Sequence, residues 1–182
     1  TVSQYSKNDI VNIYHVNPDK IDVVYNGANE NFKPISEEEK QLCRKKHTHS
    51  APFFLFIGAL HPRKNLANLF IAFDSFKKFI SSESEKPPNN TEKAKIKLLI
   101  VGKKKWWTKE MQFAYQGMEF NNEVIFINRL SGIELNNVMA SALALTYVSN
   151  FEGFGIPILF HSRSTSQSRY FSLSSLSLIL DA

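Results

Sequence analysis

Two neighbouring cations follow an apolar run of strand length in the first half of the chain. In GALHPRKN, Arg63 and Lys64 stand at the entrance to a stretch with helical periodicity. A planar guanidinium beside a compact ammonium, close to the positive end of a helix dipole, is a good receptor for a diphosphate. The alternative is a basic helix start that only contacts water, and this motif alone leaves both interpretations open.

An acid and two glycines follow another apolar run, in SNFEGFGIP. Gly153 and Gly155 allow backbone N–H groups to turn toward an anion, and Glu152 can accept hydrogen bonds from hydroxyls. A sugar attached to a diphosphate would use both halves of such a loop. The alternative is a glycine turn between a strand and a helix, with a solvated glutamate.

The segments between these motifs predict the fold that positions them. Continuous apolar runs predict buried strands, and apolar residues at spacings of three and four predict helices. The strands are expected at 21–25, 51–60, 96–102, 122–127 and 142–149. Helices are expected at 4–14, 108–116 and 131–142, and two more are expected to begin at residue 36 and after residue 65. A polar stretch at 81–93 predicts a surface loop.

Strands alternate with helices through the whole middle of the chain, which predicts the α/β class. We expect a Rossmann-like, doubly wound parallel sheet with right-handed crossovers and helices on both faces. In such sheets the ligand lies outside the carboxyl ends of the strands. Both motifs follow predicted strands, so they are expected to meet at that edge.

Composition limits the possible functions without choosing among them. The chain has 182 residues, of which 43% are hydrophobic, and this suits one core of ordinary size. A formal charge of +5 fits nucleic acid, a membrane surface or a phosphorylated small molecule. Cys43, within a charged stretch that predicts a solvated helix face, is the single cysteine, which excludes an internal disulfide framework. No apolar run has the length of a membrane span, so we expect a soluble, cytoplasmic protein.

Several segments together resemble a known family. SQYSKNDI, KIDVVYNG, FIGALHPRKNL, LLIVGKKKW, VIFINRLSGIEL and SNFEGFGIPI are similar, in order and spacing, to the C-terminal domain of the family-four GT-B glycosyltransferases. Those are retaining enzymes that transfer a sugar from a nucleotide donor. The resemblance covers about Thr1 to Leu159. It implies that 1–25 is the end of an N-terminal domain with its connector, and that 26–159 is a nucleotide-sugar-binding C-terminal domain.

The resemblance also implies roles for individual residues. Lys64 matches the lysine that binds the donor diphosphate, and Glu152 matches the acid that faces the donor sugar. Many members have an arginine directly after the strand-end glycine, Gly58; Ala59 stands there, and we infer that Arg63 supplies the guanidinium. The expected catalytic residues are therefore Arg63, Lys64 and Glu152. The expected donor-binding residues are these three with Gly58, Leu130 near the base, and Gly153, Phe154 and Gly155 beside the diphosphate.

The family pattern also sets the expected substrates. The donor is expected to carry mannose on guanosine diphosphate, with uridine diphosphate donors close behind, and no metal or other cofactor is expected. The acceptor, a glycan or a lipid-linked glycan, would bind through the N-terminal domain, and the protein would associate peripherally with the inner face of a membrane. No nucleic-acid partner is expected. The chain alone is expected to transfer no sugar.

The chain departs from the family pattern at Phe160, where the family has a second glutamate that holds the ribose. From there, 160–182 is a Ser-rich tail without glycine or proline, and it shows no helix-then-strand pattern. We interpret it as atypical and hypothesise a shifted reading frame or an altered splice. The fold is therefore expected to be incomplete at its C-terminus.

Three alternatives stay open at the sequence level. The chain could be a catalytically inactive remnant, or a binding module with an incomplete site. It could also be a basic nucleic-acid or membrane-surface module that uses KKKWW, with Trp106 and Trp107 on bases or lipid. Packing over a loop is the simpler interpretation of these tryptophans. His47 and His49 have a spacing that can bind metal, but no further ligands stand nearby.

Overall fold

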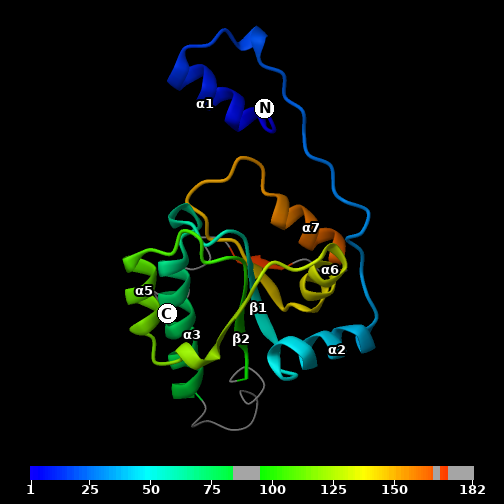
Figure 1. Ribbon diagram of the computed structural model, residues 1–182, viewed down its shortest axis with the longest axis vertical. Coiled ribbons are helices and arrows are strands. Elements are labelled where there is room, and N and C mark those ends of the chain that lie inside the picture. The colour runs from blue at the N-terminus through cyan, green and yellow to red at the C-terminus, as the bar shows by residue number, and fades with distance from the viewer. Residues whose placement is uncertain (84–94, 166–168, 172–182) are drawn as a thin grey trace.

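A parallel sheet flanked by helices forms the body of the protein in the computed structural model (Figure 1). The structure describes residues 1–83, 95–165 and 169–171. The strands lie in the order β3-β2-β1-β4-β5, and every pair is parallel. They are β1 (Phe53–Ile57), β2 (Lys97–Val101), β3 (Val124–Ile127), β4 (Ala144–Thr146) and β5 (Tyr170–Phe171). The predicted doubly wound α/β class is therefore confirmed.

Helices cover both faces of this sheet, as the sequence predicts. One face carries α3 and α5, and the other carries α2, α6 and α7 (Figure 1). The α-helices are α1 (Gln4–Tyr14), α2 (Glu37–Thr48), α3 (Leu66–Glu83), α5 (Lys109–Gln116), α6 (Gly132–Ser141) and α7 (Ile156–Ser164). Short 3₁₀ turns are η1 (Pro18–Lys20), η2 (Pro62–Lys64) and η3 (Asn121–Glu123).

The core explains why the two longest apolar runs become central strands. Side chains of β1 and β2 alternate between the two faces, so each strand contributes to two apolar clusters. Leu98 and Ile100 pack with the apolar stripe of α3, whereas Leu99 and Val101 pack with α6. Burial on both faces therefore accounts for the lack of polar alternation in these runs.

Side-chain caps fix where several helices begin. Ser36 accepts a hydrogen bond from the Glu39 N–H at 3.2 Å, and the Glu39 carboxylate accepts from the Ser36 N–H at 2.8 Å. This reciprocal capping box satisfies N–H groups that lack helical partners. Thr108 and Ser131 cap α5 and α6 with single hydrogen bonds, which confirms the predicted starts of both helices.

Two sequence predictions about elements are wrong, and a third has its start shifted by three residues. Residues 21–25 form no strand; this segment is exposed for much of its length, and the Val24 N–H donates to the Thr1 carbonyl at 2.8 Å rather than to a ladder. The face of α2 that carries Cys43 is not solvated, because this side chain is 7% exposed and packs against the cluster of α6. The predicted loop 81–93 starts later than expected, since α3 continues to Glu83; most of that loop lies outside the described residues.

The end of the described chain also corrects a prediction, namely that the Ser-rich tail shows no helix followed by a strand. A helix and then a strand follow the FEGFG loop, namely α7 and β5. Gly155 caps α7, and a proline in its first turn supplies a fixed φ that suits a helix start. A serine in this segment is compatible with burial, because the Ser164 hydroxyl donates to the Asn136 amide oxygen at 2.9 Å and the residue is buried. Strand β5 then pairs with β4 at Leu145. Residues 172–182 lie outside the described part.

None of the described helices is long and apolar enough to cross a membrane.

Candidate functional site

The first predicted motif follows β1 and forms the tight turn η2. The His61 ring nitrogen accepts a hydrogen bond from the Arg63 N–H at 3.2 Å, which shapes the turn. Asn65 ends it in the left-handed conformation, with φ of 59°, and its side-chain amide donates to the Val148 carbonyl at 3.2 Å. The turn is therefore tied to the segment after β4, although 83 residues separate the two partners.

The second predicted motif lies against the first, so the structure brings Arg63, Lys64 and Glu152 together. Lys64 forms an ion pair with one oxygen of the Glu152 carboxylate. Arg63 donates to the other oxygen at 3.3 Å and to the Phe151 carbonyl at 3.2 Å. The Asn150 N–H donates in turn to the Arg63 carbonyl at 2.9 Å. These contacts join the loops that follow β1 and β4.

Burial differs strongly between the three charged side chains. The Lys64 side chain is 9% exposed and that of Glu152 is 17% exposed, while 46% of the Arg63 side chain is exposed. Burial acts to raise the pKa of Glu152, but hydrogen bonds from Lys64, Ser149 and Arg63, with the charge of Lys64, outweigh it and hold that pKa below its ordinary value. Glu152 is therefore a carboxylate at neutral pH.

Tyr147 is a site residue that sequence reasoning missed. Its ring lies under the Lys64 ammonium, which is 5.9 Å from the ring centroid. The hydroxyl is buried and finds no hydrogen-bond partner among the described residues. Burial first, and then the negative charge of Glu152, raise the pKa of this phenol. Tyr147 lies inside a strand-like apolar run, so the sequence did not indicate that it contacts Lys64.

Glycines permit the close approach of the loops. A Cβ on Gly102 would lie 1.9 Å from the Gly58 carbonyl oxygen, so only a glycine fits where the ends of β1 and β2 meet. Gly58 itself has φ of 151°, and a Cβ there would lie 3.5 Å from Cε of Lys64. Gly155 has φ of 95° and precedes α7, whose first N–H groups lie at the same edge of the sheet.

A cleft of about 530 Å³ opens at the carboxyl ends of β1, β2 and β3. Gly58 lines it and also lies beside Lys64, so the cleft adjoins the ion-pair cluster. Leu130, the residue that the resemblance places near a base, lines the cleft as well. Its other lining residues are Ile57, Ala59, Val101, Gly102, Lys103, Lys105, Trp106, Arg129, Gly132 and Leu135.

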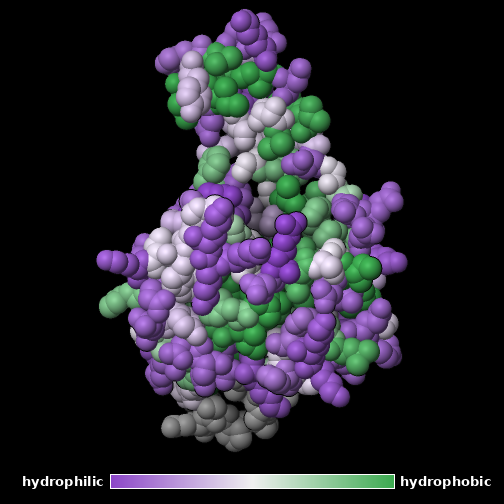
Figure 2. Space-filling view, viewed as in Figure 1, coloured by the Kyte–Doolittle hydropathy of each residue, from purple (hydrophilic) through white to green (hydrophobic). Residues whose placement is uncertain are grey.

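The N-terminal segment covers one side of the FEGFG loop. The ring of Tyr5 lies 5.8 Å from that of Phe151, and the ring of Tyr25 lies 6.1 Å from that of Phe154. A Cβ on Gly153 would lie 3.6 Å from the Ser6 hydroxyl. Apart from these contacts α1 lies away from the sheet, and Figure 2 shows hydrophobic residues at the surface of this lobe.

The KKKWW motif divides into a packed part and an exposed part. Trp107 donates to the Gln112 side chain at 2.7 Å, and the Lys104 ammonium lies 4.7 Å from its ring centroid. This tryptophan packs against the core cluster, as the simpler interpretation predicts. Trp106 instead is 46% exposed and lines the cleft.

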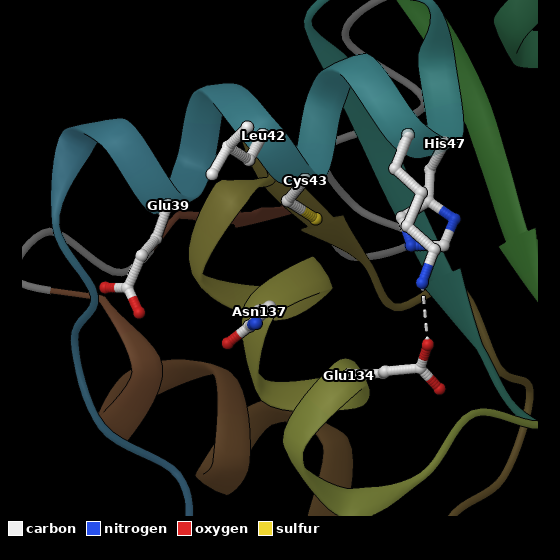
Figure 3. A pocket seen from close by; sticks show the side chains of 7 residues that line it. Glu39, Leu42, Cys43, His47, Glu134 and Asn137 are labelled. Atoms are coloured by element: carbon white, nitrogen blue, oxygen red, sulfur yellow. Dashed lines mark hydrogen bonds and ion pairs between the residues drawn. The ribbon is translucent and has the colours of Figure 1, made fainter.

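A smaller cleft of about 180 Å³ lies between α2 and α6, and His47, one of the two histidines of the suggested metal spacing, lines it. His49 lines a different cleft. Figure 3 shows Cys43 pointing from α2 toward α6, with His47 one turn further along the same helix. Lys46 pairs with Glu134 across the gap at 2.8 Å. Burial raises the pKa of the Cys43 thiol and lowers that of His47. Among the described residues no group of three or more histidine, cysteine or acidic side chains could hold a metal ion.

Residues 37–159 match the family of glycosyl transferases group 1. The chain belongs to the group 1 glycosyl transferases. A relative within the curated proteins is the O-antigen chain mannosyltransferase RfbU of Salmonella typhimurium, 31% identical over 157 residues. This alignment covers 86% of the present chain and 37% of RfbU, so the chain spans well under half of that relative.

Solved structures of other glycosyltransferases share the fold of this group 1 chain. The structure of WaaG, a glycosyltransferase of lipopolysaccharide biosynthesis, superposes with a TM-score of 0.73 at 14% identity, over 99% of this chain and 51% of WaaG. HepE from Anabaena, solved in complex with UDP-glucose, superposes with a TM-score of 0.72 at 17% identity, over 98% of this chain and 51% of HepE. The predicted fold, the C-terminal Rossmann-like half of a GT-B glycosyltransferase, is confirmed.

Proposed function

We propose that this chain is the part of a retaining hexosyltransferase that binds the nucleotide-sugar donor, with mannose as the favoured sugar. The observation that carries the proposal is the meeting of Arg63, Lys64 and Glu152 at the carboxyl edge of the sheet. Membership of the group 1 family supports the reaction class. The name of the relative RfbU, a mannosyltransferase, supports the sugar, and the UDP-glucose complex of HepE supports a nucleotide-linked donor.

In this proposal the cations stabilise the leaving group. Departure of a nucleoside diphosphate develops negative charge on its bridging oxygen, and donors already oriented toward that oxygen lower the barrier. Lys64 would serve as the buried point charge and Arg63 as the exposed, planar donor. The N–H groups of Gly153 to Gly155 and the start of α7 would add further donors.

Glu152 would orient the donor sugar rather than bind phosphate. A carboxylate accepts hydrogen bonds only, so it suits the hydroxyls of a hexose. Attack on the anomeric carbon from the face that the diphosphate leaves would retain the configuration. The acceptor, a glycan or a lipid-linked glycan, would bind to another part of the full-length protein, with peripheral association at a membrane.

Calorimetric titration with GDP, UDP and ADP tests the proposal. Saturable binding is expected, and the double variant Arg63→Ala, Lys64→Ala should lose it. A second double variant, Lys45→Ala with Arg163→Ala, removes the same charge from exposed positions on α2 and α7 and should bind normally. Thermal unfolding of each variant checks that it is folded. Absence of binding by the folded, unmodified chain would contradict the proposal.

A further inference from the structure

The cleft beside the ion-pair cluster has a lining of uneven chemistry. Ile57, Val101, Leu130 and Leu135 form an apolar inner wall, while Lys103, Lys105 and Arg129 are exposed cations on the loops around it. Among the described residues no acidic side chain lines the cleft. An apolar inner wall with cations around it suits a flat, weakly polar group attached to an anion.

Trp106 supplies the aromatic face of this cleft. Its ring meets the His61 ring edge-on, with centroids 5.6 Å apart and planes at 66°. His61 is itself fixed, because its ring accepts the hydrogen bond from the Arg63 N–H. The position of the indole is thus coupled to the loop of the proposed diphosphate cations.

The exposed indole already attracts a partner over its ring. The Lys105 ammonium lies 4.9 Å from the ring centroid, a distance typical of a cation–π contact. Lys105 is an exposed side chain on a flexible stem, so a larger planar group can displace it. Displacement would leave the Lys105 ammonium close to an anionic ligand.

We infer that Trp106 stacks on the base of the donor nucleotide and makes the cleft prefer a purine to a pyrimidine. The inference rests on the proposed function and adds to it the class of base. Stacking between a base and an aromatic side chain grows with the overlapping area, and the double ring of a purine covers more of an indole than uracil does. The effect should therefore be selective for the base and leave diphosphate binding intact.

Affinities of GDP, UDP and inorganic pyrophosphate for the chain and its Trp106→Ala variant test the inference. The unmodified chain should bind GDP more tightly than UDP. The variant should lose about tenfold or more in GDP affinity, in line with the usual effect of removing a stacking partner, and less for UDP. Pyrophosphate affinity should not change. Trp106→Phe should restore most of the GDP affinity.

Two further variants separate the contribution of the indole ring from the contributions of the cations. Lys105→Ala removes the cation above the ring and keeps the ring, so it should preserve the preference for GDP. If the unmodified chain prefers UDP, or if Trp106→Ala weakens GDP and UDP equally or not at all, the inference is wrong. In those cases loss of binding in the Arg63→Ala, Lys64→Ala variant would still support the donor site. If the unmodified chain binds none of the three ligands, the proposed function fails together with the inference.

Discussion

At the scale of single residues, Glu152 is the anion that the structure pairs with both proposed diphosphate cations. Its two carboxylate oxygens accept from Lys64 and Arg63. A diphosphate bound by the same cations competes with this carboxylate for their charge and is repelled by it. Glu152 would therefore reduce the affinity for the nucleoside diphosphate product while it orients the sugar.

Glu152→Gln is expected to bind GDP more tightly than the unmodified chain. The glutamine keeps the size of the side chain but removes the charge that holds Lys64, and a gain of about fivefold is expected from the usual strength of such pairs. Glu134→Gln, which breaks the distant pair with Lys46, is the matched control and should leave the affinity unchanged. Titration calorimetry measures both, and weaker GDP binding by Glu152→Gln would argue against competition.

The same carboxylate predicts a dependence of stability on pH. The pKa of Glu152 is lower in the folded chain than its ordinary value, so its ionisation stabilises the fold above the unfolded pKa of about 4.3, and this contribution disappears as pH falls through the folded pKa. Between pH 6 and pH 3 the free energy of unfolding should fall more for the unmodified chain than for Glu152→Gln. Denaturant unfolding at several pH values measures this, and parallel curves would show that Glu152 contributes nothing.

Because a phenylalanine stands at position 160, we expect the site to discriminate weakly between ribose and 2′-deoxyribose. The Phe160 ring stacks on Phe32 with centroids 4.2 Å apart and planes at 15°, inside the cluster beneath α7. The family pattern would place a ribose-binding glutamate at this position. Without that carboxylate, 2′-deoxy-GDP should bind as tightly as GDP, within about twofold, since no pair of hydroxyls is selected. Competition between the two nucleotides is the measurement, and a tenfold preference for GDP would refute the expectation.

At the scale of elements, the loops after β1 and β2 meet with no room for a side chain. This contact fixes the rim of the cleft, because Gly58 and Gly102 directly follow two neighbouring strands. Backbone atoms cannot move aside as the end of a flexible side chain can. The geometry of the rim is therefore set by the sheet rather than by the loops.

Gly102→Ala should destabilise the fold by about 3 kcal/mol, the upper range of overpacking, because its Cβ would overlap the Gly58 carbonyl. Gly132→Ala is the matched control. It lies at the start of α6, and no atom outside its immediate surroundings comes within 4 Å of its Cβ position, so the change should be small. Urea unfolding of both variants provides the comparison; equal stability of the two would show that the strand ends separate easily.

Sequence patterns predicted the elements that bury apolar faces and failed where the structure depends on distant partners. The runs at β1 and β2 and the stripe of α3 stand out because burial dictates their composition. The stretch 21–25 has strand-like composition, but no strand of the sheet pairs with it. Helix α7 was missed because its buried serine and histidine look polar, although Ser164 is satisfied by Asn136 in α6.

The candidate site shows the same division. Arg63, Lys64 and Glu152 could be predicted because a parallel sheet brings strand ends to one edge. Tyr147 could not, because an aromatic residue in an apolar run is ordinary by composition. For Trp106 the sequence left contact with bases or lipid and packing over a loop both open. Only their positions in space, beside Lys64 and over the cleft, set them apart.

At the scale of the whole molecule, the N-terminal lobe supports the loop that carries Glu152. Tyr5 in α1 and Tyr25 after η1 contact the two phenylalanines of FEGFG. These contacts hold the loop against the N-terminal segment. Order in the proposed sugar site thus depends on a segment far from it in sequence.

The double variant Tyr5→Ala, Tyr25→Ala should therefore bind GDP less tightly, by about threefold to tenfold for two lost aromatic contacts, with little change in the unfolding of the sheet. Tyr14→Ala, at the exposed end of α1, is the control and should bind as the unmodified chain does. Hydrogen exchange of the FEGFG amides should rise in the double variant alone. Unchanged exchange and affinity would mean that the lobe and the loop are independent.

The pairing of Lys64 with Glu152 also has a consequence for synthesis. The two residues are 88 positions apart. At a usual translation rate of about 5–20 residues per second, the ribosome needs roughly 4–18 s to reach Glu152 after it has made Lys64. During that interval β1 and α3 can pack, but Lys64, which is almost buried in the folded chain, cannot yet pair with Glu152. The nascent chain must therefore keep this cation hydrated until the last strands of the sheet emerge.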